Sequence, residues 1–355
     1  MNVHLSSPKT LSTEDFRQWR ELMRSQGGFD SPFYDPAYLR LLGFFRPQLE
    51  VALLKENNQL VAVFAYERDA THHGTPPGVK LCDYQGPIFR ENFSLPLEEL
   101  LRLCRLKSWR FDHQSLQDAQ WKKWSVRVTQ SPFIDLSNGY EAYVARQKPT
   151  TGLFSQTARK CRKLEREVGP VEFHWHTGDS ESFETLLKWK SAQRKLTKTF
   201  DILQSEWVVS FLREIQTTQQ DELQGTLSIL TVNETLAAVH LGMATPTAFH
   251  YWFPSYNQDL QRYSPGLILL LNMIEEAARR KIQRFDFGKG EEGYKQSFAT
   301  DAVQLAEGAV DFNPISRALR GSAYQAWEWV KSSPMYGPAN ELKRWIQRRR
   351  SQSTM

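Results

Sequence analysis

The sequence has few cysteines and none of the common nucleotide or hydrolase motifs. Its three cysteines form no CxxC pair, so a disulfide framework or a cysteine zinc site is not expected. No Walker lysine motif, GxSxG elbow or HExxH occurs, which excludes P-loop ATPases, lipase-type hydrolases and zincins. Unbroken apolar runs stay far below the roughly 20 residues that span a bilayer, and no apolar signal region opens the chain. We therefore expect a cytoplasmic protein.

The sequence contains enough apolar residues to form a folded hydrophobic core. The chain has 355 residues, of which 40% are apolar and 24% charged. This composition indicates a globular protein, with length for about two domains of roughly 150 residues. Lys and Arg number 45 against 40 acidic residues, a net charge of +5. Such a mild excess fits an anionic ligand or surface and does not identify one.

A faint internal duplication is the main architectural signal. Residues 51–67 and 226–244 each contain two β-rich runs around an Asn-containing turn, at Asn57 and Asn233. Further along, WRFD at 109–112 and QRFD at 283–286 lie at nearly the same offset. Chance similarity of two short α/β stretches is the alternative. We predict a tandem repeat, with a helix near residues 13–23 opened by a capping signal, and further helices over 95–108, 156–168 and 266–281.

Two segments of the second copy carry residues suited to chemistry. Residues 261–267, with Arg262, precede the 266–281 helix, and a helix start exposes N–H groups that bind phosphate. An ordinary loop with a good helix-start signal is the alternative. Residues 285–298, FDFGKGEEGYKQSF, run from a strand that contains Asp286 into a glycine-rich charged loop. An acid next to a cation can act as a base, or it can simply cap the loop.

Other candidates are weaker. His240 and His250 fall in predicted strands, where a lone histidine is more often structural. His174 and His176 alternate around Trp175, and with no evident third ligand they give little support for a metal. Residues 131–143 read as a turn followed by a helix, and residues 188–200 as a basic amphipathic stretch. The GKGEEG sequence matches the dinucleotide pattern by letter only, because no long apolar helix follows.

These blocks together resemble a known family. Residues 157–298, with the basic RKCRKLEREVGPVEF opening, LAAVHLG, FHYWFPSYNQDLQRYSPGLILLLNMIEEA and the closing FDFGKGEEGYKQSF, are similar to the CelD-type (cellulose and exopolysaccharide biosynthesis) acetyltransferases of the GNAT superfamily. The first half resembles a degenerate second GNAT unit, as in the related Fem-type aminoacyl transferases. The resemblance implies an α/β fold of tandem GNAT-like domains, each with a mixed central sheet flanked by helices. We expect an N-terminal domain over 1–145, an acyltransferase domain over 146–312 and a helical basic tail over 313–355.

The resemblance also implies an activity. It predicts an acyltransferase that moves an acyl group from acyl-CoA, such as acetyl-CoA, to an amine or hydroxyl of a sugar or envelope precursor, without a metal. The implied residues are, for catalysis, Asp286, Tyr294 and Lys295; for the cofactor, Arg262, Ser264, Gly266 and Leu267; and for substrate, His240, Tyr251 and Glu291. The family's usual phosphate-loop pattern is replaced here by RYSPGL.

Two alternatives stay open. One is a Fem-like transferase that uses aminoacyl-tRNA, for which the basic segments 156–168 and 188–198 would contact the tRNA. The other is a catalytically silent scaffold of a polysaccharide synthase. Independently of these alternatives, the basic KRWIQRRR sequence at 343–350 is a candidate contact with a polysaccharide synthase or with the inner membrane surface.

Overall fold

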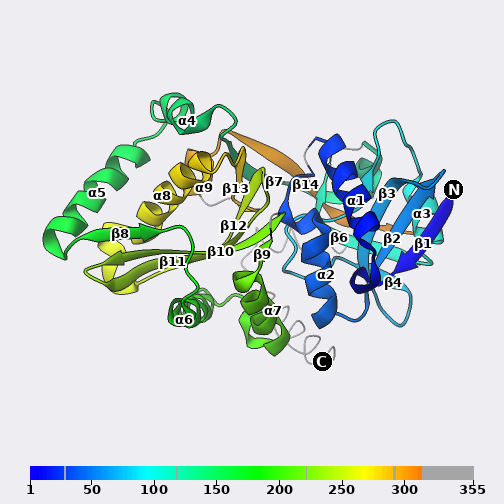
Figure 1. The fold of residues 1–355 in the computed structure, drawn as a ribbon, viewed down its shortest axis with the longest axis horizontal. Helices are drawn as coiled ribbons and strands as arrows, with labels where there is room; N and C mark the ends of the chain where they lie inside the picture. Colours follow the sequence, from blue (N-terminus) through cyan, green and yellow to red (C-terminus); the bar gives the residue numbers. More distant parts are fainter. Residues whose placement is uncertain (28, 117–118, 221, 291–292, 314–355) are drawn as a thin grey trace, which may run out of the picture.

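The computed structural model describes residues 1–27, 29–116, 119–220, 222–290 and 293–313. Their centre is a single large mixed sheet with helices on both faces (Figure 1). The predicted basic tail lies almost wholly outside the described residues. The strands are β1 (Asn2–Ser6), β2 (Leu49–Glu56), β3 (Gln59–Arg68), β4 (His73–Thr75), β5 (Ile88–Phe89), β6 (Ser108–Ser115), β7 (Ser125–Asp135), β8 (Val171–His174), β9 (Gln219–Gln220), β10 (Leu223–Val232), β11 (Thr235–Ala244), β12 (Ala248–Tyr256), β13 (Arg284–Asp286) and β14 (Asp301–Asp311).

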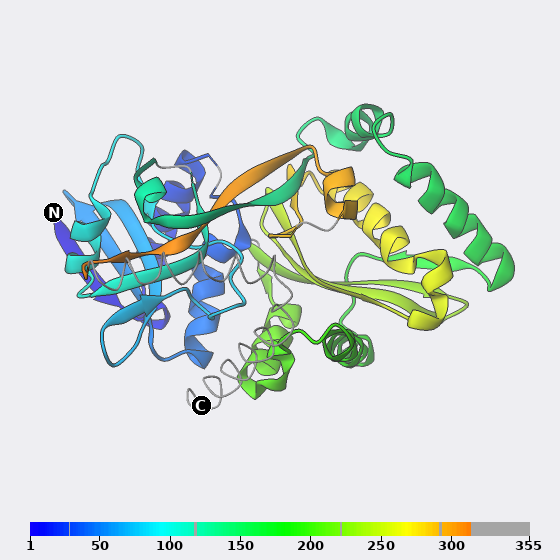
Figure 2. The same cartoon turned by 180° about the vertical axis from the view of Figure 1, so that it is seen from behind.

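The strand order confirms the predicted tandem repeat. It runs β1-β2-β3-β4-β6-β14-β7-β13-β12-β11-β10-β8, which reads as two equivalent halves meeting at β14 and β7. In each half an antiparallel hairpin is followed by a parallel pair, β4 with β6 and β12 with β13. The last strands are exchanged: β7, which follows the first copy in sequence, pairs with β13, and β14 pairs with β6. Figure 2 shows these two long strands crossing between the halves.

The two hairpins turn in the same way because their sequences allow it. Asn57 and Asn58 between β2 and β3, and Asn233 and Glu234 between β10 and β11, all have positive φ angles between 47° and 64°. Two consecutive residues of this kind form the turn whose twist matches paired strands, and asparagine tolerates it well. The turn signal that predicted the duplication therefore reports a shared backbone geometry.

Helices follow the apolar periodicity of the sequence. They are α1 (Thr13–Ser25), α2 (Pro36–Phe45), α3 (Leu97–Leu103), α4 (Gly139–Gln147), α5 (Leu153–Glu167), α6 (Ser180–Leu196), α7 (Glu206–Thr217), α8 (Pro265–Arg279) and α9 (Gly293–Phe298), with short 3-10 turns η1 (Pro8–Thr10), η2 (Pro32–Tyr34), η3 (Ala119–Trp124), η4 (Ile202–Gln204) and η5 (Gln258–Tyr263). The capping box expected at the first helix is present, because Ser12 accepts from the Asp15 amide and Asp15 accepts from the Ser12 amide.

Three predictions of local structure need correction. Residues 131–135 belong to strand β7 and not to a turn, because β13 and β14 pair with them on both sides. The helix expected over 95–108 ends at Leu103, and Arg105 then takes a positive φ of 56°. Tyr294 and Lys295 lie in the short helix α9 and not in an open loop.

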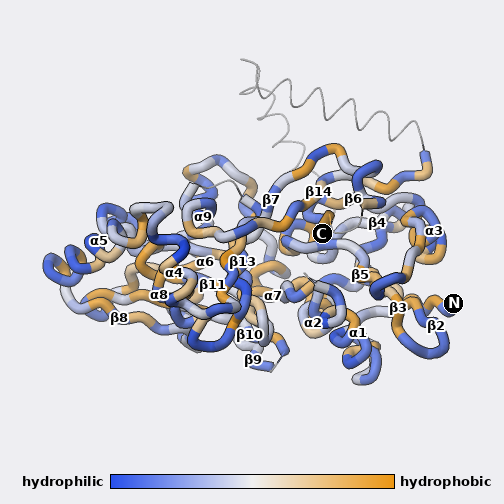
Figure 3. Tube along the Cα trace, turned by 90° about the horizontal axis from the view of Figure 1, so that it is seen from above, coloured by the Kyte–Doolittle hydropathy of each residue, from blue (hydrophilic) through white to orange (hydrophobic). Residues whose placement is uncertain are grey.

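The hydrophobic core joins the halves. One buried cluster contains residues of α1 and α2 together with residues of α6 and α7, so it runs along one face of the whole sheet. At its middle the Tyr38 ring of α2 meets Phe211 of α7 edge to face, with ring centroids 5.6 Å apart. The opposite face has two separate clusters, under α3 in the first half and under α8 in the second. Figure 3 shows the two halves side by side from above.

Candidate active site at the junction of the halves

Asp286, at the end of β13, is a buried carboxylate in the middle of the sheet. It pairs in register with His250 of β12 on one side and with Phe133 of β7 on the other. Its oxygens accept hydrogen bonds from Tyr84 Oη at 2.5 Å, Arg284 Nη2 at 2.8 Å and, in addition, from Ser131 Oγ at 2.9 Å and the Gly288 amide at 2.8 Å. Four donors around one carboxylate fix its position. This arrangement suits an orienting acid better than a mobile proton acceptor.

The neighbour of Asp286 on β12 is a fully buried histidine between two carboxylates. His250 Nε2 lies 2.9 Å from Asp83 Oδ2, and its Nδ1 lies 3.8 Å from Asp286 Oδ1. An ionised carboxylate can only accept, so Nε2 carries a proton that it donates to Asp83. Burial raises the pKa of Asp83, but the hydrogen bond and charge of His250, with the nearby His113 and Lys295, outweigh burial and hold that pKa below its usual value.

Asp83 is the accessible member of this pair. Its side chain keeps 23% of its exposure, whereas that of His250 keeps none. Gly288 lies directly against both: a Cβ at this position would come within 2.9 Å of Asp83 Oδ2 and 3.3 Å of the His250 ring. Its φ of +68° also favours glycine. The glycine that follows β13 therefore leaves room for the Asp83–His250 pair.

The first half contributes a second histidine and carboxylate. Asp112, the repeat equivalent of Asp286, has its Oδ1 2.9 Å from His113 Nδ1 and 2.6 Å from Gln85 Nε2. Gln85 Oε1 accepts from the amides of both residues. His113 Nε2 in turn lies 3.7 Å from Asp83 Oδ1. Carboxylates and imidazoles thus alternate across the junction, from Asp112 in the first half to Asp286 in the second.

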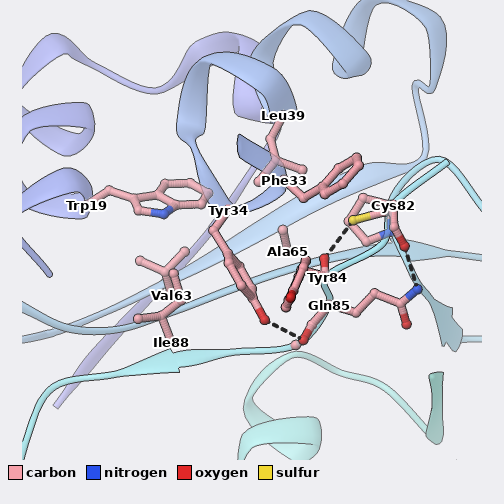
Figure 4. A pocket seen from close by; sticks show the side chains of 12 residues that line it. Trp19, Phe33, Tyr34, Leu39, Val63, Ala65, Cys82, Tyr84, Gln85 and Ile88 are labelled. Carbon is pink, nitrogen blue, oxygen red and sulfur yellow. Dashed lines mark hydrogen bonds between the residues drawn. The ribbon is translucent and has the colours of Figure 1, made fainter. Parts of the chain in front are cut away.

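The segment that carries Asp83 and Tyr84 is held firmly in the first half. Figure 4 shows its backbone over the aromatic core of that half, where Tyr34 Oη donates to the Gln85 carbonyl at 3.0 Å and Gln85 Nε2 donates to the Cys82 carbonyl at 3.0 Å. The cavity beneath it measures about 20 Å³, room for about one water molecule. Asp83 is therefore presented to the junction by a packed support.

The predicted phosphate-binding loop, residues 261–267, lies at the start of α8. Ser264, which precedes the helix, has a left-handed backbone with a φ of 54°, and its side chain makes no capping hydrogen bond to the helix. Instead Ser264 Oγ accepts from Lys160 Nζ of α5 at 2.7 Å. Arg262 donates to Tyr263 Oη at 2.6 Å, Gly266 is half-buried, and Leu267 packs on the core of the second half.

The remaining predicted residues fall into three groups. Lys295 is buried, with its charge near Asp83, so it belongs to the junction, and Tyr294 packs on the core beside it. His240 and Tyr251 are buried and stack with ring centroids 4.2 Å apart, and His240 Nε2 accepts from the Trp252 amide at 2.9 Å. Burial holds the pKa of His240 well below its usual value. Glu291 lies outside the described residues. Substrate binding by these three stays a prediction.

Several residues of the site were not anticipated from sequence. Asp83, Tyr84 and Ser131 come from segments with no motif, and Arg284 precedes Asp286 inside a strand that was noted only for its acid. The WRFD repeat does mark Asp112, but His113, the next residue, carries no sequence signal. Lys160 was noted only as one of many basic residues. The sequence does not reveal which distant segments the sheet brings together.

The described residues contain neither a metal-ligand cluster nor a membrane-spanning helix. Among them, no group of three or more His, Cys, Asp or Glu side chains is arranged to hold a metal ion. Within the same residues, every helix is too short or too polar to cross a bilayer.

Comparison with known proteins agrees with the second half's sequence pattern. Residues 153–296 match the family model for the acetyltransferase (GNAT) domain. No curated protein matches the sequence.

Solved structures with this fold share little sequence with the chain. FemX is 8% identical with a TM-score of 0.55, over 87% of this chain and 96% of that one. The C-terminal domain of a putative lysylphosphatidylglycerol synthetase from Agrobacterium fabrum is 11% identical with a TM-score of 0.53, over 86% and 94%. L-PGS from Bacillus licheniformis is 13% identical with a TM-score of 0.51, over 88% and 96%. These likenesses concern the fold, whereas the sequence match is specific to the second half, where residues 153–296 are similar to the acetyltransferase (GNAT) domain.

Proposed function

We propose that this protein transfers an acyl group from acyl-CoA, such as acetyl-CoA, to an amine or hydroxyl of a sugar or of an envelope or exopolysaccharide precursor. The observation that carries the proposal is the start of α8 within the acetyltransferase domain. There Lys160 donates a hydrogen bond to Ser264, the residue that precedes α8, and no side chain caps the start of this helix.

Charge at this helix start favours an anion. The N-terminal end of a helix carries a partial positive charge, so a lysine there is unfavourable unless a negative group lies between them. Lys163 adds a second ammonium, 5.9 Å from the centre of the Tyr263 ring, and Arg262 lies over the same ring at 4.7 Å. Glu167 already lies 4.0 Å from Lys163 and accepts from Tyr263 Oη at 2.9 Å, so a phosphate or pyrophosphate at the α8 start would chiefly neutralise Lys160.

The distance from the start of α8 to the end of β13 suits a long donor molecule. With 15 residues, α8 is about 22 Å long at about 1.5 Å per residue. Strand β12 pairs with β13 from Ala248 to His250, beside Asp286. It then continues to Tyr256, which lies against Gly266 at the start of α8. A donor with phosphates at one end and its reacting carbonyl at the other, as in acyl-CoA, would place that carbonyl near Gly288.

Acetyl-CoA titration of a Lys160 variant tests this proposal. Lys160→Ala should weaken binding at least tenfold in isothermal titration calorimetry, because it removes a cation from the phosphate. Lys281→Ala, an exposed lysine just past the opposite end of α8, is the matched control and should bind like the wild type. Wild-type affinity in Lys160→Ala, or no acetyl-CoA binding by the wild-type protein, would contradict the proposed donor site.

A second candidate is an aminoacyl-tRNA-dependent transfer, as in Fem-type enzymes. It is favoured by the outer surface of α5, where Arg159, Arg162, Lys163 and Arg166 are exposed. Figure 3 shows this helix at the outer edge of the second half. Binding of tRNA that weakens steeply with salt, together with no response to acetyl-CoA, would support this candidate. A catalytically silent scaffold would leave both donors unbound, whereas contact with a synthase or membrane through residues 343–350 is compatible with either donor.

A further inference from the structure

The first half contains a histidine whose surroundings match those of a general base. His113 follows Asp112 at the end of the WRFD repeat, and its Nδ1 is 2.9 Å from Asp112 Oδ1. Because an ionised carboxylate only accepts, Nδ1 carries a proton, and in the neutral imidazole Nε2 then holds the lone pair. The His113 side chain is 16% exposed, so a ligand can reach it.

The supporting residues hold this pair in place. Gln85 Nε2 donates to Asp112 Oδ1 at 2.6 Å, while Gln85 Oε1 accepts from the Asp112 and His113 amides at 3.0 and 3.2 Å. Burial raises the pKa of Asp112, but the hydrogen bond and charge of His113, together with the Gln85 hydrogen bond and the charge of Lys289, outweigh it, so that the pKa is lowered overall. A carboxylate that stays ionised stabilises the imidazolium that forms when Nε2 takes a proton.

The free nitrogen faces an accessible carboxylate. His113 Nε2 and Asp83 Oδ1 are 3.7 Å apart, too far for a direct hydrogen bond. A nitrogen bound between them could donate one proton to His113 and another to Asp83. Asp83 is in turn fixed by His250, which ties this position to the β12–β13 end of the second half.

We propose that the first half supplies the general base of the reaction: His113, oriented by Asp112, deprotonates an amine acceptor that Asp83 holds at the junction. The inference rests on the proposed acyl transfer to an amine. It assigns the acceptor class as a primary amine, because two N–H groups are needed to reach both residues. The first copy is then a working part of the active site.

The step conserves atoms and charge. The amine nitrogen attacks the donor carbonyl carbon, a C–N bond forms, and the N–H proton passes to His113 Nε2. Collapse of the tetrahedral intermediate breaks the C–S bond and releases the CoA thiolate. The imidazolium returns its proton to this thiolate, directly or through water, so the products are an amide and free CoA.

Nitrogen-15 NMR of the histidine side chains tests the assignment without any acceptor. In the wild-type protein we expect His113 to carry its proton on Nδ1, and Asp112→Asn to shift its imidazole signals. His113→Gln identifies the resonance, and His174→Gln, in the exposed β8 position, is the matched control. A neutral His113 protonated on Nε2 would overturn the proposal.

Kinetics with acetyl-CoA and glucosamine test the role itself. His113→Gln should lower kcat by about 100-fold or more at neutral pH, the usual range for a lost general base. The defect should shrink as pH rises and free amine becomes abundant. The charged groups that face this position are Asp83, Asp112 and Lys289. A structural defect would not recover in this way.

Donor binding separates failure of this inference from failure of the proposed function. Acetyl-CoA affinity measured by calorimetry should be the same in His113→Gln and wild type. Unchanged affinity with a wild-type kcat would remove His113 and keep the acyltransferase. Absence of acetyl-CoA binding in both proteins would reject the proposed function as well.

Discussion

The chemistry of the junction depends on a few buried charges and their immediate partners. Asp286 and Arg284 are both largely buried and joined at 2.8 Å, and Tyr84 contacts both. Such a pair contributes little net stability when intact but costs several kcal/mol when one partner is removed. Residue-scale predictions therefore involve stability as well as activity.

Asp286→Asn should destabilise the protein and also abolish transfer. The change removes one of the two carboxylates that pair with Arg284, because Asp30 Oδ1 still lies 3.1 Å from its Nη1, and the expected loss is about 2 kcal/mol in free energy of unfolding. Urea unfolding followed by circular dichroism measures it. Asp301→Asn, an exposed aspartate at the start of β14, is the control and should change little. Full stability with lost activity would show that Asp286 acts in the chemistry alone.

Gly288→Ala should disrupt the Asp83–His250 pair. A methyl group at this position would approach Asp83 Oδ2 to 2.9 Å on a backbone with positive φ, so either Asp83 or the loop must move. We expect a loss of about 1 kcal/mol or more in stability, together with a fall in kcat. Gly178→Ala is the comparison, because nothing lies within 4 Å of its added carbon. Equal behaviour of the two variants would refute the close-approach argument.

Asp83 predicts a pH dependence of stability. The pKa of Asp83 is lowered in the folded protein, so the unfolded chain binds the proton more readily. The ionised Asp83 therefore stabilises the folded state at pH values above the usual aspartate pKa of about 4. As pH falls below about 4 this contribution should disappear. Urea unfolding of wild type and Asp83→Asn should therefore differ at pH 7 and converge in acid. A difference that grew in acid would mean that the pKa is raised.

At the scale of elements, the hairpin turns show how local sequence sets geometry. Glu234 has a φ of 63° in an exposed turn, where a side chain of this type is strained. Glu234→Gly should stabilise the protein by about 0.5–1 kcal/mol. Glu172→Gly, an exposed change within strand β8, should destabilise it by a similar amount. Thermal unfolding of both variants tests the pair, and the same sign in both would contradict the turn argument.

At the scale of the whole molecule, strand exchange makes the halves dependent on each other. Strand β14 pairs with β6 and β7, and β7 pairs with β13. A fragment of residues 1–145 would therefore expose the edge of β6 and lose the partners of β7. We expect fragments 1–145 and 146–313 to be unfolded or aggregated when expressed alone and to recover structure together. Amide NMR spectra of each fragment measure this, and dispersed spectra from separate halves would contradict it.

Much of the fold was readable from sequence because its signals are local. The capping box at Ser12, the turns at Asn57 and Asn233, and the apolar periodicity of α8 each depend on neighbours along the chain. The repeated RFD sequence also located the equivalent strands β6 and β13 of the two halves. The turn predicted at 131–135 was wrong because pairing with distant strands, and not local preference, makes it a strand.

The sequence by itself determined a tandem α/β protein with an acetyltransferase-like second half, because repeats, periodicity and family blocks are written in consecutive residues. Only the tertiary structure decided that Asp83, Tyr84 and His113 of the first half meet His250 and Asp286 of the second. The physical reason is the exchange of β7 and β14, which joins two sheets edge to edge and brings charged groups from five separate segments into one buried junction.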